Sequence, residues 1–392
     1  MTDIYIVSGA RTAIGAFGGG LSSLRPAELG TIVMKEAIDR AGIVAADVQN
    51  VVVGTVVLTQ PKDVYVSRVA AVNAGVPVET PAMNVNRLCG SGLQAVVSAA
   101  QGIALGEQDI AIAGGAESMS NAPLMCLTAR NGQKMGDQLL VDAMLGALHD
   151  PFENIHMGVT AENVAERCAI SREAQDEAAV ESHRRAINAI QNGYFKDQIV
   201  PVEIKIRKGT TVFDTDEHAR ADASVESLAG LKPVFKKDGT VTAGNASGIN
   251  DGAAAVVLAS GKAVQEKGLK PMARILGWGH AGVEPNVMGL GPVKAVPVAL
   301  QRANLTLDQM DVIEANEAFA AQACAVAKEL GLSAAKTNPN GSGISLGHPI
   351  GATGVILTVK AMYELQRTGG RYALITMCIG GGQGIAMVIE RV

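Results

Sequence analysis

Three glycine-rich stretches of the chain each carry one side chain capable of covalent or proton-transfer chemistry. Cys89 lies in residues 86–92 (NRLCGSG), His348 lies in 347–351 (GHPIG), and Cys378 begins 378–382 (CIGGG). One cysteine can attack a carbonyl carbon while a histidine takes its proton. A second thiol can then act as an acid or a base on carbon. The combination predicts covalent catalysis at a carbonyl group, coupled to proton transfer at carbon.

Each of the three side chains also has a purely structural interpretation. A cysteine beside glycines is often a small packed residue, a histidine before a helix can cap it, and Cys378 can fill a core. A papain-type site is excluded at Cys89, because positions 92 and 93 are Gly and Leu. Three such loops in one chain favour a shared site.

The elements around these residues follow from hydrophobic spacing. The run 81–85 predicts a short buried strand before Cys89, and apolar residues at helical spacing over 93–105 predict a helix after it. A helix N-terminus stabilises a thiolate, so we expect Cys89 to ionise readily. The polar pair Asn316–Glu317 follows a strand at 312–316, where α/β sheets place ligand sites.

The chain divides into four segments by composition. Strands and helices alternate over residues 1–118, which predicts a doubly wound α/β half whose strand at 109–113 ends in the glycine-rich stretch 114–118. Residues 119–248 are more polar and loop-rich, as an inserted domain would be. The pattern returns to the first half at 249–270 and forms a second α/β half at 271–392. The strand–turn–helix pattern at Cys89 recurs at His348, which indicates duplicated halves with the site between them.

Composition excludes several classes of partner. The formal charge of the 392 residues is −5, so there is no overall case for nucleic acid binding. No apolar run is long enough to span a bilayer, so we expect no membrane association, and residues 1–10 lack the pattern of a signal peptide. The five cysteines are widely spaced, which favours a reducing, cytoplasmic setting and no metal site.

Taken together, the motifs resemble those of the thiolases over essentially the whole length. The matching stretches are 86–92, 114–120 (GGAESMS), 245–248 (NASG), 316–319 (NEAF), 347–351 and 378–382. The resemblance implies duplicated thiolase-like α/β halves in α-β-α-β-α layers, with an inserted loop domain for coenzyme A (CoA) binding and oligomer contacts. One departure is Ser342, where many members have glycine.

The resemblance also implies a role for each reactive group. Cys89 would be acylated, and His348 would activate it and help to hold the thioester oxygen. Cys378 would exchange a proton with the substrate's α-carbon. Asn316 would position a water that joins His348 in one oxyanion hole, and the backbone N–H groups of Cys89 and Gly380 would form the other.

Binding residues carry over from the family by position. The CoA contacts implied are Arg220, Ser227, Ala243 and Ser247. The pantetheine or acyl pocket implied comprises Leu148, His156, Met157, Phe235, Met288, Ala318 and Phe319. No cofactor is expected, because CoA thioesters are the substrates. The other histidines (His149, His183, His218 and His280) are expected on the surface or in loops. The apolar side chains of 121–141 predict an oligomer contact, and the family suggests a homotetramer built from dimers.

The similarity is closest to bacterial biosynthetic acetyl-CoA acetyltransferases and to the broad-specificity β-ketothiolases that supply polyhydroxyalkanoate precursors. The expected reaction is a reversible Claisen condensation of two acyl-CoAs to a short-chain 3-ketoacyl-CoA, by a ping-pong path through acyl-Cys89. One alternative is a degradative 3-ketoacyl-CoA thiolase of fatty-acid β-oxidation. Others are a ketoacyl synthase, which would pair its cysteine with two histidines or with histidine and asparagine, and a non-catalytic acyl-CoA carrier.

Overall fold

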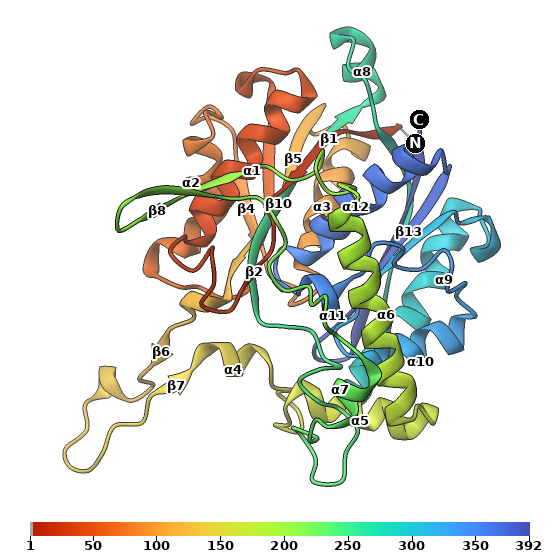
Figure 1. The fold of residues 1–392 in the computed structure, drawn as a ribbon. Helices are drawn as coiled ribbons and strands as arrows, with labels where there is room; N and C mark the ends of the chain where they lie inside the picture. Colours follow the sequence, from red (N-terminus) through yellow and green to blue (C-terminus); the bar gives the residue numbers. More distant parts are fainter. Residues whose placement is uncertain (1–2) are drawn as a thin grey trace.

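One mixed sheet runs through both halves of the chain (Figure 1). The structure, a computed structural model, describes residues 3–392. The strand order is β12-β13-β14-β11-β1-β10-β5-β3-β4, and the short β2 (Gly15–Ala16) pairs with β10. The remaining bounds are β1 Ile4–Arg11, β3 Asn50–Gly54, β4 Ala82–Val85, β5 Ile110–Ser118, β10 Asn250–Ser260, β11 Ala273–Gly282, β12 Val312–Ala315, β13 Tyr372–Ile379 and β14 Gln383–Arg391.

The two halves of the sheet meet at β1 and β11, through the pairs Tyr5–Arg274 and Ile6–Ala273. The expectation of a doubly wound first half is only partly correct. Strand β3 is parallel to β4 and β5, and β12 is parallel to β13, but the other pairs are antiparallel. The three-residue link between β13 and β14 forces one of these, since a parallel return needs a crossover of about a dozen residues.

Alternate residues of the strands face two different helical layers, because side chains of a strand point to opposite faces. Val51 and Val53 pack against α1 (Pro26–Ala41) and α2 (Val66–Asn73), whereas Val52 packs against α3 (Ser91–Ala104). In the second half, Leu374 faces α9 (Gly291–Ala303) and Ile375 faces α12 (Thr353–Thr368). The predicted α-β-α-β-α layers are therefore confirmed.

Helices α3 and α12 form the central layer and lie against each other (Figure 1). Their first turns are in closest contact. A side chain at Gly354 would collide with Leu93, and one at Gly92 would meet the carbonyl oxygen of Gly351 at 3.0 Å. Only glycine allows the two helix starts to approach this closely. The loops that precede the helices, which carry Cys89 and His348, are thus brought together.

The segment 119–248 packs on the core in more than one place: Val202 and Ile204 join the cluster of α1, and Ala186 joins that of α3 and α12. It contains β6 (Leu124–Met125), β7 (Val141–Asp142), α4 (Ala143–Ala147), α5 (Met157–Cys168), α6 (Arg172–Gln191), β8 (Val202–Ile206), β9 (Gly209–Phe213) and α7 (Val225–Ala229). Outside this segment, the remaining helices are α8 (Gly261–Lys267), α10 (Ala320–Leu330) and α11 (Gly343–Leu346). The β6–β7 arm projects away from the body (Figure 1). Ser171 caps α6, as its position predicts, by accepting a hydrogen bond from the N–H of Ala174.

One local prediction is wrong. The strand before Cys89, β4, is not buried but forms the edge of the sheet, with Met83 49% exposed. The strand predicted at 109–113 is longer than expected, because β5 continues through the buried stretch 114–118. Within residues 3–392, no helix is long and apolar enough to cross a membrane. The division into four segments stays a prediction.

Candidate active site

Cys89 sits on a tight turn between β4 and α3. The preceding residue, Leu88, has φ of 46°, a left-handed conformation that costs a non-glycine residue about 1–3 kcal/mol. The Ser91 hydroxyl holds the turn, because it accepts from the N–H of Arg87 at 2.8 Å and donates to the carbonyl of Leu88 at 2.7 Å. The strained turn therefore presents the thiol at the start of α3.

The Cys89 thiol is not predisposed to ionise, contrary to the expectation from its helix start. Burial raises its pKa to about 11, and the charge of Glu117 acts in the same direction. The N–H groups of Gly380 and of Cys89 itself hydrogen-bond the sulfur and oppose the shift, but burial outweighs them. The thiol is protonated near neutral pH, so its attack requires a base.

His348 has the protonation state and the tautomer of such a base. The Thr353 hydroxyl donates its one proton to the carbonyl of Pro349 at 2.9 Å, and its oxygen lies 2.7 Å from Nδ1 of His348. A hydroxyl has a single donor, so Nδ1 must carry the imidazole proton and Nε2 must carry the lone pair. Burial lowers the pKa of His348 to about 4, which leaves the ring neutral.

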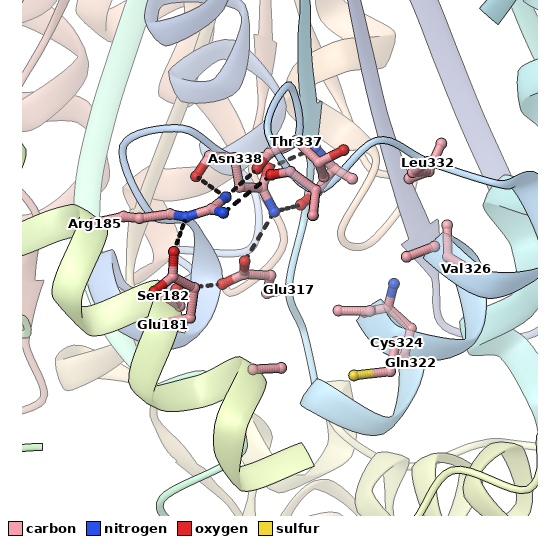
Figure 2. Close-up of a pocket in the computed structure, with 15 residues that line it drawn as sticks. Glu181, Ser182, Arg185, Glu317, Gln322, Cys324, Val326, Leu332, Thr337 and Asn338 are labelled. Carbon is pink, nitrogen blue, oxygen red and sulfur yellow. Dashed lines mark hydrogen bonds and ion pairs between the residues drawn. The ribbon is translucent and has the colours of Figure 1, made fainter. Parts of the chain in front are cut away.

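The polar pair Asn316–Glu317 divides between two environments. Asn316 faces His348, with Nδ2 at 3.4 Å from Nε2. Glu317 instead accepts hydrogen bonds from Ser182 at 2.6 Å and Asn338 at 2.9 Å, at the wall of a separate cavity of about 250 Å³ (Figure 2). Burial raises the pKa of the Glu317 carboxyl, and these bonds oppose it. Only Asn316 lies where the reactive imidazole can use it.

Cys378 lies near the end of β13, fully buried in an apolar cluster. Burial raises the pKa of its thiol well above the usual range, and neighbouring Cys89 adds to the shift. Five of the predicted pocket residues belong to this cluster: Met157, Phe235, Met288, Ala318 and Phe319. Leu148 belongs instead to a second cluster, against which Cys89 also packs. The predicted acyl-pocket residues therefore lie in the two clusters that hold the two thiols.

His156 joins this pocket through an aromatic stack. Its ring lies on Phe235 with centroids 4.6 Å apart, and Phe235 meets the edge of Phe319 at 6.2 Å. Nδ1 of His156 accepts from the N–H of Gly158, which caps the first turn of α5. Its ring is thereby fixed as a wall of the pocket.

The hairpin after Cys378 supplies the amide that faces Cys89. Gly381 and Gly382 have φ of 79° and 84°, so two successive left-handed residues turn the chain from β13 into β14. A side chain at Gly90 would collide with Ile379, and one at Gly380 would meet Leu88 and Met157 at 3.2 Å. The Cys89 and Cys378 loops are therefore in direct contact.

A cavity of about 260 Å³ lies in the inserted segment and includes three of the four predicted CoA contacts: Arg220, Ser227 and Ala243. The fourth, Ser247, is absent from its lining, and its N–H donates to Ala318 at 3.0 Å. Ser247 therefore contacts a residue of the predicted acyl pocket and lies between Ala246 and Gly248, which do line the cavity. The segment 246–248 runs from this cavity to Ala318.

Two histidines expected in surface or loop positions also line this cavity. His183 is buried on α6, and its Nδ1 accepts from the N–H of Arg220 at 3.2 Å. Burial lowers the pKa of His183 to about 4 and also lowers that of His218. The expectation for His183 is wrong, because helical spacing alone does not say which face a long polar helix buries. His218 does lie in a loop, where it is half-buried. His280 is instead in a strand, β11, and contacts Gln94 at 2.8 Å.

Comparison with known proteins agrees with this geometry. Residues 4–262 match the family described as "Thiolase, N-terminal domain", and residues 269–391 match "Thiolase, C-terminal domain". The chain belongs to the thiolase family. It is 64% identical over 391 residues to a protein named beta-ketothiolase BktB from Cupriavidus necator, covering 100% of this chain and 99% of that protein.

Further relatives and solved structures also match this thiolase over nearly its whole length. An acetyl-CoA acetyltransferase from Chromobacterium violaceum is 50% identical and covers 99% of this chain and 100% of its own length. The crystal structure of human mitochondrial 3-ketoacyl-CoA thiolase superposes with a TM-score of 0.98 at 43% identity, covering 100% and 99%. The crystal structure of the Bacillus anthracis acetyl-CoA acetyltransferase superposes with a TM-score of 0.98 at 46% sequence identity, with the same coverage. This thiolase is accordingly an acyltransferase.

Sequence reasoning missed one buried carboxylate of this thiolase site. Glu117 accepts hydrogen bonds from the N–H groups of Val56 (3.1 Å), Val57 (3.0 Å) and Gly351 (2.8 Å). Burial raises its pKa to about 8. It thereby fastens the loop after His348 to the first half of the thiolase. The motif 114–120 contains Glu117 and could have indicated its importance, but the match of this motif to the family gave the carboxylate no role.

Proposed function

We propose that this thiolase is an acetyl-CoA C-acetyltransferase, a β-ketothiolase that condenses two acyl-CoAs reversibly to a short-chain 3-ketoacyl-CoA and CoA. One observation carries the proposal. The protonated Cys89 thiol lies against the N–H groups of Cys89 and Gly380, in a site that also holds a neutral imidazole whose Nε2 carries the lone pair. This arrangement suits formation and breakdown of a thioester on Cys89.

The first half-reaction transfers an acetyl group to Cys89. Nε2 of His348 takes the thiol proton as Cys89 Sγ attacks the carbonyl carbon of acetyl-CoA. The tetrahedral oxyanion accepts hydrogen bonds from the N–H groups of Cys89 and Gly380, which contribute about 3 kcal/mol each. Collapse breaks the carbon–sulfur bond to CoA, and the Cys378 thiol gives its proton to the leaving thiolate, so that Cys378 becomes a thiolate while His348 keeps its proton on Nε2.

The second half-reaction forms the carbon–carbon bond. The Cys378 thiolate removes a proton from the methyl group of a second acetyl-CoA, and the resulting enolate oxygen accepts hydrogen bonds from the protonated Nε2 of His348 and from a water on Asn316. The enolate carbon attacks acetyl-Cys89, and collapse releases acetoacetyl-CoA and the Cys89 thiolate, which takes back its proton from His348. In the reverse direction, the Cys378 thiol protonates the leaving carbanion, a role supported by its raised pKa.

Thiolysis of acetoacetyl-CoA by CoA tests this proposal, followed as loss of the 3-ketoacyl absorbance. We expect turnover with CoA thioesters. Turnover with carrier-protein thioesters alone would favour a ketoacyl synthase, a reading that Cys378 disfavours. Binding of acetoacetyl-CoA without turnover would favour a non-catalytic carrier. The degradative alternative is separated by chain length, as described in the Discussion.

The CoA moiety is assigned to the cavity that contains Arg220. Its phosphates need local cations, because the protein is acidic overall. From this cavity, the pantetheine arm would follow 246–248 to the pocket of Met157 and Phe319. The proposed reaction uses these side chains and the two thioesters alone, with no metal or cofactor.

We further propose a homotetramer built from dimers. The β6–β7 arm exposes apolar side chains that a single chain leaves in water: Leu124, Met125, Leu127, Met135, Leu139 and Leu140. Surfaces of this kind mark contacts between subunits. The free edge of β4 offers a second contact, since unpaired strands readily pair with another copy. Sedimentation of Leu127→Glu/Leu139→Glu should show a dimer in place of a tetramer.

A cytoplasmic location is part of the same proposal. The five cysteines of the described chain are all unpaired, and the proposed chemistry needs Cys89 and Cys378 as thiols. A reducing compartment maintains them in that state. Supply of polyhydroxyalkanoate precursors fits a condensing enzyme, and deletion of its gene in a polymer-forming host should reduce incorporation of five-carbon units.

A further inference from the structure

A cavity of about 10 Å³, enough for one water, lies next to Asn316. Its polar wall is formed by Asn316, Ser342, Thr353 and Lys360, and its remaining wall is largely apolar. A water needs two to four polar partners to stay in such a place. Thr353 and Lys360 belong to α12, so the cavity lies between this helix and Asn316.

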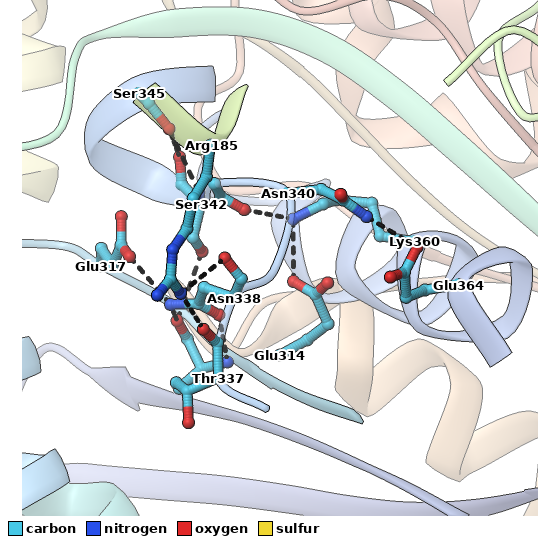
Figure 3. A network of polar contacts seen from close by, with 12 residues as sticks. Arg185, Glu314, Glu317, Thr337, Asn338, Asn340, Ser342, Ser345, Lys360 and Glu364 are labelled. Atoms are coloured by element: carbon cyan, nitrogen blue, oxygen red, sulfur yellow. Dashed lines mark hydrogen bonds and ion pairs between the residues drawn. The ribbon is translucent and has the colours of Figure 1, made fainter. Parts of the chain in front are cut away.

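Lys360 is one of the most deeply buried charges of the described chain, at 2% exposure. Its Nζ donates to Glu314 Oε2 at 2.8 Å and to the carbonyl of Gly341 at 2.6 Å (Figure 3). An ammonium group has three N–H donors, so one is left for the cavity. Apolar residues of similar size often replace a buried ion pair without loss of stability, so stability alone does not require this pair.

Asn316 offers the matching acceptor. Its Nδ2 faces His348, while its Oδ1 is buried and has no hydrogen-bond partner among the described residues. A buried acceptor left in that state is destabilising. The hydroxyl groups of the wall already have partners. That of Ser342 donates to the carbonyl of Ala315 at 3.3 Å, and that of Thr353 accepts from His348 and donates to the carbonyl of Pro349.

We propose that Lys360 is a positioning residue for the condensation, acting through one water in this cavity that accepts from Nζ and donates to Oδ1 of Asn316. The bridge fixes the amide with Nδ2 toward His348 and polarises its N–H groups toward the enolate oxygen. The inference rests on the role proposed for Asn316. Ser342, which stands where many family members have glycine, reduces the cavity to the size of this one water.

The charge state of the pair supports this arrangement. Burial raises the pKa of Glu314 to about 7, and the charge of Lys360 opposes it. Oε1 of Glu314 has no partner among the described residues either, so the carboxylate depends on Lys360 for its charge. Removing Lys360 alone would leave Glu314 to take up a proton. The test therefore changes both residues together.

The test compares Glu314→Gln/Lys360→Met with wild type in two assays. Exchange of labelled CoA into acetyl-CoA requires only acetylation of Cys89, whereas thiolysis of acetoacetyl-CoA also forms the enolate. We expect exchange to stay within twofold and the kcat of thiolysis to fall tenfold or more, with KM within threefold. Asp109→Asn/Lys262→Met, which removes an exposed ion pair, is the matched control and should behave as wild type.

A double-mutant cycle with Asn316→Ala shows whether Lys360 acts through Asn316. In that background, the paired change should lower thiolysis by less than twofold. Equal loss in exchange and thiolysis, or losses that multiply in the double variant, would overturn the proposal. If Asn316→Ala itself spares thiolysis, the role of Asn316 fails and this inference fails with it. If it impairs thiolysis while the paired change does not, this inference alone fails.

A crystal structure of the unmodified protein tests the proposal without any variant. We expect a density peak for a water within hydrogen-bond distance of both Lys360 Nζ and Asn316 Oδ1. A structure that shows ordered internal waters elsewhere but none between these two atoms would overturn it.

Discussion

The Thr353 hydroxyl determines which nitrogen of His348 can act as a base. It lies 2.7 Å from Nδ1 and donates its own proton to Pro349, so it can only accept from the ring. Thr353 is the first residue of α12, whose first turn packs on that of α3. The packing of two buried helices thereby holds the hydroxyl that orients the imidazole.

Replacement of Thr353 by valine should impair the enzyme by removing this acceptor at nearly constant volume. The loss of one buried hydrogen-bond partner should raise the activation free energy of acetylation by about 1.4–2.8 kcal/mol, which makes acetylation of Cys89 about 10- to 100-fold slower. Rapid-quench mass spectrometry with acetyl-CoA measures it. Thr353→Ser retains the hydroxyl and is the control. Equal rates for the valine and serine variants would contradict this role.

Acetylation should be insensitive to pH where an ordinary histidine titrates. An imidazole with a pKa of about 6.5 would be about 90% protonated at pH 5.5, but burial lowers that of His348 to about 4. Single-turnover acetylation should therefore change less than twofold between pH 5.5 and 8. An inflection near 6.5 would contradict the assignment.

The same pKa shift has a defined effect on stability. Between pH 6.5 and 4, the unfolded chain binds more protons at His348 than the folded chain does, so its contribution decreases as pH falls through this window. Above pH 6.5 that contribution is complete. Denaturant unfolding of wild type and His348→Asn should show a weaker pH dependence for the variant. Identical dependence would show that His348 does not carry the linkage.

The two thiols should separate the two half-reactions. Cys89→Ala should form no acyl-enzyme, whereas Cys378→Ala should still be acetylated by acetyl-CoA but should not condense it. Peptide mass spectrometry after incubation with acetyl-CoA locates the adduct. An adduct on Cys378 with none on Cys89 in the wild type would reverse the assignment.

Arg220→Ala should weaken the use of CoA more than turnover. The side chain is at the cavity assigned to CoA, and removal of binding that is uniform along the reaction raises KM with little change in kcat. Steady-state thiolysis at varied CoA measures both constants, with Arg184→Ala, an exposed arginine on α6, as the control. An unchanged KM would make Arg220 a simple surface charge.

Chain-length preference separates the biosynthetic from the degradative alternative. The pocket contains Met157 and Met288, whose unbranched side chains can yield to one further methylene. We expect kcat/KM for thiolysis of 3-ketovaleryl-CoA to lie within about tenfold of that for acetoacetyl-CoA, which corresponds to a difference in activation free energy of about 1.4 kcal/mol or less. Sixteen-carbon 3-ketopalmitoyl-CoA should be poor. A maximum of kcat/KM at sixteen carbons would favour a degradative thiolase.

Local spacing was sufficient to predict the main strands and helices and the loops that carry Cys89, His348 and Cys378, whereas the layers were implied by the family resemblance. Apolar strands covered on both faces and helix starts beside glycines leave clear patterns. Long-range contacts leave none. Strand β10 pairs with strands more than a hundred residues away in the sequence, and Glu317 bonds Ser182, which is equally distant. The edge position of β4 depends on the order of the whole sheet. None of these contacts has a local pattern.

Electrostatic environment was equally hidden from the sequence. The helix start at Cys89 predicted an acidic thiol, but burial dominates, and burial arises from residues of both halves. His183 and Glu117 were overlooked for the same reason. A polar residue on a buried face has the same local pattern as one in water, until the elements that cover it are placed.

The central layer of α3 and α12 has a consequence for synthesis of the chain on the ribosome. Helix α3 emerges about 250 residues before its partner. Until α12 arrives, the first half presents an apolar helix face that it cannot bury by itself, and exposed surfaces of this kind promote aggregation. Fragments that end near residue 262 should need a chaperone to stay in solution without aggregating. The enzyme should therefore depend most on chaperones while only its first half has been synthesised.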